Sequence, residues 1–148
     1  DRLLAQVYDT LRGMAAARFN RSGAGNTLQP TVVVHEALMR LLGNEVECAY
    51  DGRDGVTLAQ RFRPHMILMD LAMPGMDGYE TRRRLAAGSQ PAPAFMVAMT
   101  GYGNEDDKRR TREAGFDAHL TKPVELDALV GLLNDARSRH GKAPTAAR

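Results

Sequence analysis

The sequence of 148 residues lacks several features that would each indicate a particular class of protein. Its single cysteine, Cys48, cannot form a disulfide within the chain, and no cluster of cysteine and histidine has the spacing of a metal site. No apolar run is long enough to cross a bilayer, and the first residues form neither a basic leader nor an apolar signal segment. These absences argue against a disulfide-bonded secreted scaffold and predict a cytoplasmic protein without a membrane span.

Charge of one sign is also scarce, because the formal net charge is only +2. This value is too small to indicate a nucleic-acid partner by itself. Two basic clusters, at residues 82–84 and 108–110, are most simply interpreted as the solvated faces of helices. We therefore expect no nucleic-acid partner and no membrane partner.

The length and the apolar content of 43% suit one domain of ordinary size with additional segments at its ends. Apolar residues at helical spacing predict an amphipathic connector helix over residues 1–19. A run rich in glycine, serine and asparagine predicts a flexible linker over residues 20–30. The main domain is expected over residues 31–137, followed by a disordered tail at 138–148. The first helix is either a connector from an upstream domain of the same chain or a dimerisation helix.

Short apolar runs alternate with helical segments through the main domain. The expected strands are 31–34, 45–49, 66–69, 94–99 and 118–120, and a helical segment follows each of them, the first of which spans only residues 35–42. Five such alternations predict an α/β fold with a parallel sheet, right-handed crossovers and helices on both faces.

Polar side chains stand at the ends of the last three expected strands. Asp70 follows the run 66–69, Thr100 follows 94–99, and Lys122 follows shortly after 118–120. Because ligands bind at the carboxyl ends of parallel strands, we expect these three side chains to meet at one edge of the sheet. A carboxylate nucleophile with a hydroxyl and an ammonium to hold the phosphoryl oxygens suits phosphoryl transfer. A turn hydroxyl at Thr100 and a surface charge at Lys122 are the simpler alternatives.

From Thr31 to about Ala136 the chain resembles the receiver domain of two-component response regulators. The matching motifs are MDLAMPGMDGYE, AMTGYG and the pair Lys122-Pro123, at the separations that the family keeps. The resemblance implies a flavodoxin-like (CheY-like), doubly wound, five-stranded sheet of order 2-1-3-4-5. It also implies that Asp70 accepts a phosphoryl group from a histidine kinase or a histidine phosphotransfer protein, with Mg²⁺ as cofactor. Thr100 and Lys122 would contact that group, the backbone carbonyl of Ala72 would be a metal ligand with Asp70, His119 would be the switch residue, and the Lys122-Pro123 peptide would be cis.

One departure from the family concerns the metal. Family members carry two adjacent acidic residues after the first strand, whereas here Val34 is followed by His35-Glu36. About seven residues are missing at this point, which predicts a first helix shortened by about two turns. Glu36 could lend one carboxylate, but a site with so few acidic oxygens should bind magnesium weakly.

Two functions remain open from the sequence. One is a phosphorylated receiver domain that signals by a conformational change. The other is a pseudo-receiver, which acts as a protein-interaction module without phosphorylation. An enzyme on the same fold is disfavoured, since no glycine-rich phosphate loop follows the first expected strand and Ala72 replaces the second acid of aspartate-based phosphatases.

Overall fold

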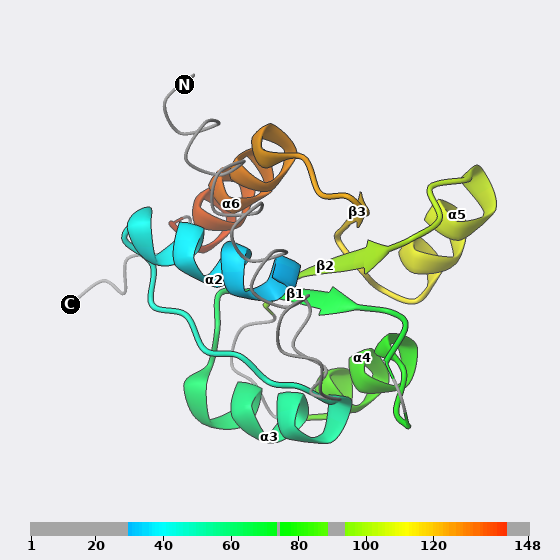
Figure 1. Ribbon diagram of the computed structural model, residues 1–148. Helices are drawn as coiled ribbons and strands as arrows, with labels where there is room; N and C mark the ends of the chain where they lie inside the picture. The colour runs from blue at the N-terminus through cyan, green and yellow to red at the C-terminus, as the bar shows by residue number, and fades with distance from the viewer. Residues whose placement is uncertain (1–29, 74, 89–93, 142–148) are drawn as a thin grey trace, which may run out of the picture. The chain divides into compact units, whose positions relative to one another are not determined.

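The computed structural model describes residues 30–73, 75–88 and 94–141 (Figure 1). The connector helix expected over residues 1–19 and the linker expected over 20–30 lie outside these ranges, except for Pro30, which is helical. Most of the expected tail lies outside them as well. The chain divides into two compact units between Tyr50 and Asp51, and each is described by itself below.

In the first unit, helix α2 spans Pro30–Leu41. The prediction of a strand at residues 31–34 is therefore wrong, and so is the prediction of a helix shortened to about eight residues. Pro30 takes the first helical position, where its missing N–H costs nothing. Valine and threonine lower helix stability by only about 0.5 kcal/mol each, so four of them do not prevent a continuous helix. A helix satisfies its own backbone, whereas a strand needs a neighbour.

The segment after α2 does not pair as a strand either, although we expected one at residues 45–49. Exposure alternates along this segment, with Val46 and Cys48 less exposed than the residues beside them. Arg40 donates to the carbonyl of Val46 at 2.7 Å, and the Cys48 thiol donates to Glu36 at 3.4 Å. Partial burial, followed by the hydrogen bond to Glu36, raises the pKa of the Cys48 thiol to about 11. Side-chain contacts with α2 therefore take the place of a strand ladder here.

The second unit contains a parallel sheet of three strands among its described residues. The strands are β1 (Met66–Asp70), β2 (Phe95–Thr100) and β3 (Ala118–Thr121), in the order β1-β2-β3. They correspond to the last three of the five expected strands, so a parallel sheet is confirmed, whereas the first two expected strands are not found in the described residues. Crossover helices join them, because parallel strands cannot be connected by a tight hairpin.

Four helices accompany these strands. They are α3 (Gly52–Phe62), α4 (Gly78–Ala87), α5 (Glu105–Glu113) and α6 (Leu126–Gly141). Asp51, Asp77 and Asn104 cap the first three of these helices, each accepting a hydrogen bond at 2.8 Å from a backbone N–H of the first turn. Helix α6 continues to Gly141, so residues 138–141, which we expected to belong to a disordered tail, are helical. No helix in the described part of the chain combines the length and the apolar character needed to cross a membrane.

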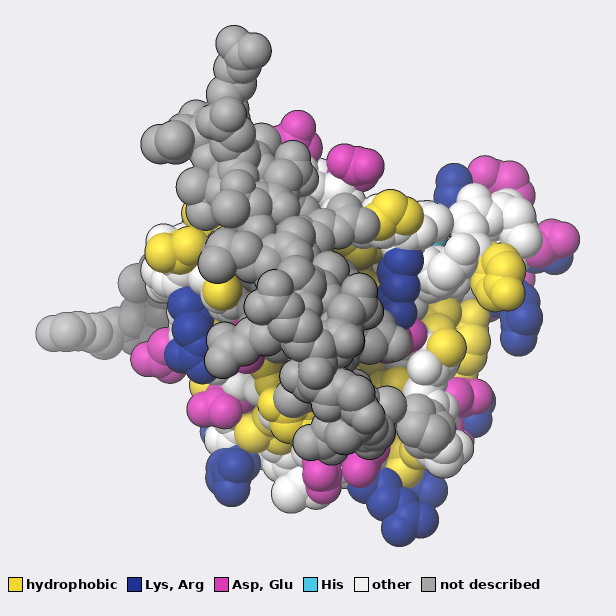
Figure 2. Space-filling view, viewed as in Figure 1, with side chains coloured by type: hydrophobic (Ala, Val, Ile, Leu, Met, Phe, Trp, Pro, Cys, Tyr) yellow, Lys and Arg dark blue, Asp and Glu magenta, His cyan; other side chains and the backbone are white. Residues whose placement is uncertain are grey.

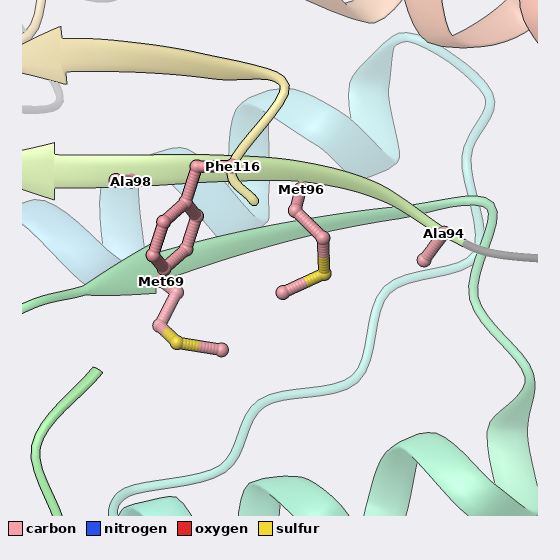
Figure 3. Packing of buried hydrophobic residues seen from close by; sticks show 5 residues of the cluster. All are labelled: Met69, Ala94, Met96, Ala98 and Phe116. Carbon is pink, nitrogen blue, oxygen red and sulfur yellow. The ribbon is translucent and has the colours of Figure 1, made fainter. Parts of the chain in front are cut away.

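The helices lie on both sides of the strands, since α3 and α4 lie together on one side and α6 lies on the other (Figure 1). The central strand β2 is accordingly buried from Met96 to Thr100. On the α4 side, a cluster forms from buried residues of β1, β2 and the segments next to β2 and β3 (Figure 3). Tyr79 of α4 packs against this cluster. The cluster consists of Met69, Ala94, Met96, Ala98 and Phe116. Burial on both faces explains why these strands are nearly continuous apolar runs.

Most of the two basic clusters lies on exposed helix faces, as predicted, but Arg82 is half-buried and donates to the carbonyl of Gly115 at 3.2 Å. Arg83 and Arg84 both pair with Glu80 in α4, at 2.6 Å and 3.0 Å. In α5, Lys108 pairs with Glu105, and Arg109 pairs with its acidic neighbours on the same helix. Figure 2 shows positive and negative side chains intermingled over α5. Much of the positive charge in these clusters is therefore compensated locally.

Candidate functional site

The site begins where β1 ends. Asp70 is the last residue of β1, and its side chain is 20% exposed. Its Oδ1 accepts a hydrogen bond from the N–H of Ala72 at 3.0 Å, which holds the carboxylate over the start of the following turn. The turn ends at Gly78, where the backbone passes close to Leu71. Only glycine fits there, because a Cβ at this position would lie 2.8 Å from the Cα of Leu71. The motif MDLAMPGMDGYE thus forms a turn around a partly buried carboxylate.

Lys122 reaches this carboxylate from the end of β3. Its N–H donates to the carbonyl of Thr100 at 2.8 Å, and its Nζ lies 2.5 Å from Oδ2 of Asp70. The Lys side chain is 28% exposed, so water screens this ion pair less than it screens a pair on the open surface. The peptide between Lys122 and Pro123 is cis, as predicted. Two residues 52 positions apart are therefore in direct contact.

Thr100 is the last residue of β2, the strand that lies between β1 and β3. It is 7% exposed, and its Oγ1 both accepts from the N–H of Tyr102 at 3.0 Å and donates to the carbonyl of Tyr102 at 3.1 Å. The described residues show no hydrogen bond between Thr100 and Asp70. The structure thus brings all three strand ends to one edge of the sheet, but it joins only the acid and the amine. The threonine hydroxyl is held in a local turn.

The partner of Thr100 was not predicted from the sequence. Tyr102 lies within the motif AMTGYG, and its side chain is 75% exposed although its backbone is bonded to the Thr100 hydroxyl. A tyrosine in a polar, glycine-rich turn was the only available signal, because turn residues normally lie at the surface.

His119 lies on β3 beside this edge. Its Nε2 is buried and has no hydrogen-bond partner among the described residues. Desolvation, followed by the positive charge of Lys108, lowers the pKa of the ring. The neutral form of the imidazole is therefore favoured. A buried polar atom without a partner in turn favours rearrangement to any state that supplies one.

The residues proposed for magnesium do not supply the donors that this ion requires. Magnesium needs near-octahedral oxygen coordination, usually with more than one carboxylate. Among the described residues, no group of three or more Asp, Glu, His or Cys side chains could hold a metal ion. Glu36 lies in α2, in the first unit, where Arg40 binds its Oε1 at 3.0 Å and Cys48 binds its Oε2. Asp70 and the carbonyl of Ala72 alone do not fit a magnesium site.

The comparisons with known proteins agree with the fold. The family model of the response regulator receiver domain matches residues 31–134. The protein PilH of Pseudomonas aeruginosa is 33% identical over 98 residues, which cover 66% of this chain and 81% of PilH. The DNA-binding dual master transcriptional regulator RpaA of Synechocystis is 29% identical over 110 residues, which cover 74% of this chain but only 46% of RpaA.

Among solved structures, the chain is similar to the receiver domain of the sensor histidine kinase PA1611 from Pseudomonas aeruginosa, which has a magnesium ion in its active-site cleft. The two share 30% identity and a TM-score of 0.63, over 75% of this chain and 88% of that domain. The chain therefore belongs to the family of response regulator receiver domains, and its fold is CheY-like. It is a signal-transduction domain of the two-component type.

Proposed function

We propose that Asp70 is the phosphoryl acceptor of this receiver domain and that a histidine kinase or a histidine phosphotransfer protein is the donor. The single observation that carries the proposal is the contact between Asp70 and Lys122 at 2.5 Å, at the carboxyl edge of the sheet. A carboxylate beside an ammonium is a nucleophile with a positive group ready for the incoming oxyanion. Relatives such as PilH and the PA1611 receiver support the assignment.

In the transfer, a carboxylate oxygen of Asp70 attacks phosphorus, and a new O–P bond forms as the P–N bond of the donor phosphohistidine breaks. The electron pair stays on the imidazole nitrogen, which takes up a proton. Lys122 moves from the carboxylate to the phosphoryl oxygens, where negative charge increases. Thr100 exchanges its bond to Tyr102 for a bond to the same group. No step makes this domain an enzyme in its own right.

The signal is a shift between two conformations, read by a partner on the surface of α5, β3 and α6. Two features support this part of the proposal. Thr100 has a hydroxyl that can exchange partners, and His119 has a buried ring atom without one among the described residues. Movement of the Thr100 hydroxyl toward the phosphoryl group would alter the space next to β3. A cytoplasmic location accords with the single, unpaired cysteine.

The test is incorporation of phosphate from a small acyl phosphate, followed by intact-mass measurement. The wild-type chain should gain one acid-stable, base-labile phosphoryl group, and Asp70→Asn should gain none. Asp127→Asn, at an exposed position in α6, is the matched control and should label like the wild type. Equal labelling of Asp70→Asn and the wild type would contradict the assignment of Asp70.

The pseudo-receiver is the second candidate, and the poor magnesium site favours it. In that case Asp70 and Lys122 form a permanent ion pair that holds the domain in one conformation for docking. No labelling of the wild type by either an acyl phosphate or a phosphorylated phosphotransfer protein would support this candidate over the first.

A further inference from the structure

Both oxygens of the Asp70 carboxylate already have positively polarised partners. Oδ1 accepts the N–H of Ala72 at 3.0 Å, and Oδ2 pairs with Nζ of Lys122 at 2.5 Å. The side chains of the pair are 20% and 28% exposed, so solvent only partly screens it. The carboxylate is thus neutralised by groups of this chain.

Further acidic ligands are not provided by the segment that should supply them. Residues 31–36 belong to the continuous helix α2, so there is no strand end at which an acid pair could stand. The one carboxylate in this stretch, Glu36, accepts two bonds from Arg40 and one from Cys48 within its own unit. Its negative charge is therefore already compensated.

Both features weaken the binding of a divalent cation at Asp70. Cation affinity rises with the number of uncompensated carboxylates, and Asp70 with Lys122 together carry no net charge. A cation at Oδ2 would also face the ammonium at short range in a site of reduced dielectric, which is repulsive. Binding would require Lys122 to leave, and no second carboxylate in the described part of the chain is available to compensate the cation.

We propose that Lys122 neutralises Asp70 in place of a divalent metal ion, so that the chemistry of Asp70 does not depend on magnesium. The proposal rests on the function proposed for Asp70, because it concerns how that same residue is activated. The covalent step is unchanged: the O–P bond forms, the donor bond to phosphorus breaks, and the leaving group keeps the electron pair. The positive charge that stabilises the transfer is the ammonium, which is part of the chain.

The first experiment measures metal binding without any phosphorylation. The melting temperature and the backbone amide resonances of residues 70–72 are recorded in EDTA and in millimolar MgCl₂. A bound ion would raise the melting temperature, because it stabilises the folded state by mass action. We expect no change in either observable for the wild type. A saturable change at residues 70–72 would overturn the proposal.

Two variants sharpen this measurement. Lys122→Met keeps the length of the side chain but removes the ammonium, so Asp70 should respond to magnesium at residues 70–72 only weakly and without saturation at millimolar MgCl₂, because one carboxylate and one carbonyl do not complete a site. The double variant Lys122→Met with Asp70→Asn should lose that response. If Lys122→Met does not fold, the wild-type titration still decides the question, as does a wild-type titration with paramagnetic Mn²⁺, which would broaden the resonances near Asp70 if the ion were bound.

The second experiment compares phosphorylation from an acyl phosphate in EDTA and in MgCl₂. The two rates should agree within about twofold, since no metal contribution exists to be lost. Labelling that occurs only with magnesium would overturn this proposal and leave the assignment of Asp70 intact. No labelling under either condition would instead contradict the assignment of Asp70, while the titration still reports on metal binding.

Discussion

Residues 66–123 and residues 31–50 both belong to the stretch that matches the receiver family, yet they relate to that family differently. The later region forms three parallel strands whose ends place Asp70 beside Lys122, as the family motifs predict. The earlier region contains a helix where a strand was expected, and a segment without a ladder where a second was expected. Two similar apolar runs therefore adopt different structures: residues 66–69 form a strand, and residues 31–34 form part of a helix.

The difference teaches that a strand depends on its neighbours more than on its own residues. The run 66–69 has β2 beside it, in a register that extends to Asp70 and Met99. The run 31–34 continues directly into residues 35–41 within the same helix α2. A helix can extend through such a run by adding one internal hydrogen bond per residue, without any partner strand.

The largest loss of stability should come from a cavity in the hydrophobic cluster that packs against β1 and β2. Phe116 is 4% exposed, and its ring meets Tyr79 edge to face at 6.2 Å. Phe116→Ala should lower the free energy of unfolding by about 3–5 kcal/mol, measured by urea denaturation, since it removes a large buried side chain and leaves a cavity. Tyr102→Ala, at a side chain that is 75% exposed, is the control and should change stability by less than about 0.5 kcal/mol. Similar losses for both variants would show that the cluster is not the core.

A smaller effect is expected at Cys48, in the other region. A thiol whose pKa is about 11 is almost fully protonated at pH 8, and only the thiolate reacts with alkylating agents. Iodoacetamide should therefore modify Cys48 at least about tenfold more slowly in the folded chain than in the urea-unfolded chain. The raised pKa alone would give a larger factor, but the thiol is partly exposed and solvent screens part of the shift. Glu36→Gln removes the adjacent negative charge and should speed the reaction.

Equal rates in the folded and unfolded chains would show that the contact between Cys48 and Glu36 is absent in solution. Arg84→Gln, on an exposed face of α4, is a charge change in the second unit and should leave the rate unaltered.

The smallest effect, and the one that tests the comparison most directly, is expected from Val33→Ala. In a helix this substitution replaces a residue of lower propensity, so stability should rise by about 0.5 kcal/mol and helical circular dichroism should increase slightly. In a paired strand the same change would instead lower stability, because alanine is disfavoured there. A loss of about 1 kcal/mol or more would show that residues 31–34 form a strand after all.

The elements that the sequence located well are those with strong local signals. Buried strands appear where unbroken apolar runs end in a polar residue, at Asp70 and at Thr100. The resemblance to the family added the cis peptide at Pro123, which the structure shows. The contact between Asp70 and Lys122 could be anticipated because parallel strands bring their carboxyl ends to one edge.

By itself the sequence determined the class of fold, the family and the identity of the acid, the hydroxyl and the amine at the ends of three strands, because these follow from local pattern and spacing. Only the tertiary structure decided that residues 31–34 are helical and that the Thr100 hydroxyl bonds to the backbone of Tyr102. Each of these outcomes depends on which partner is within reach in space, and the competing partners differ too little in energy for local sequence to choose between them.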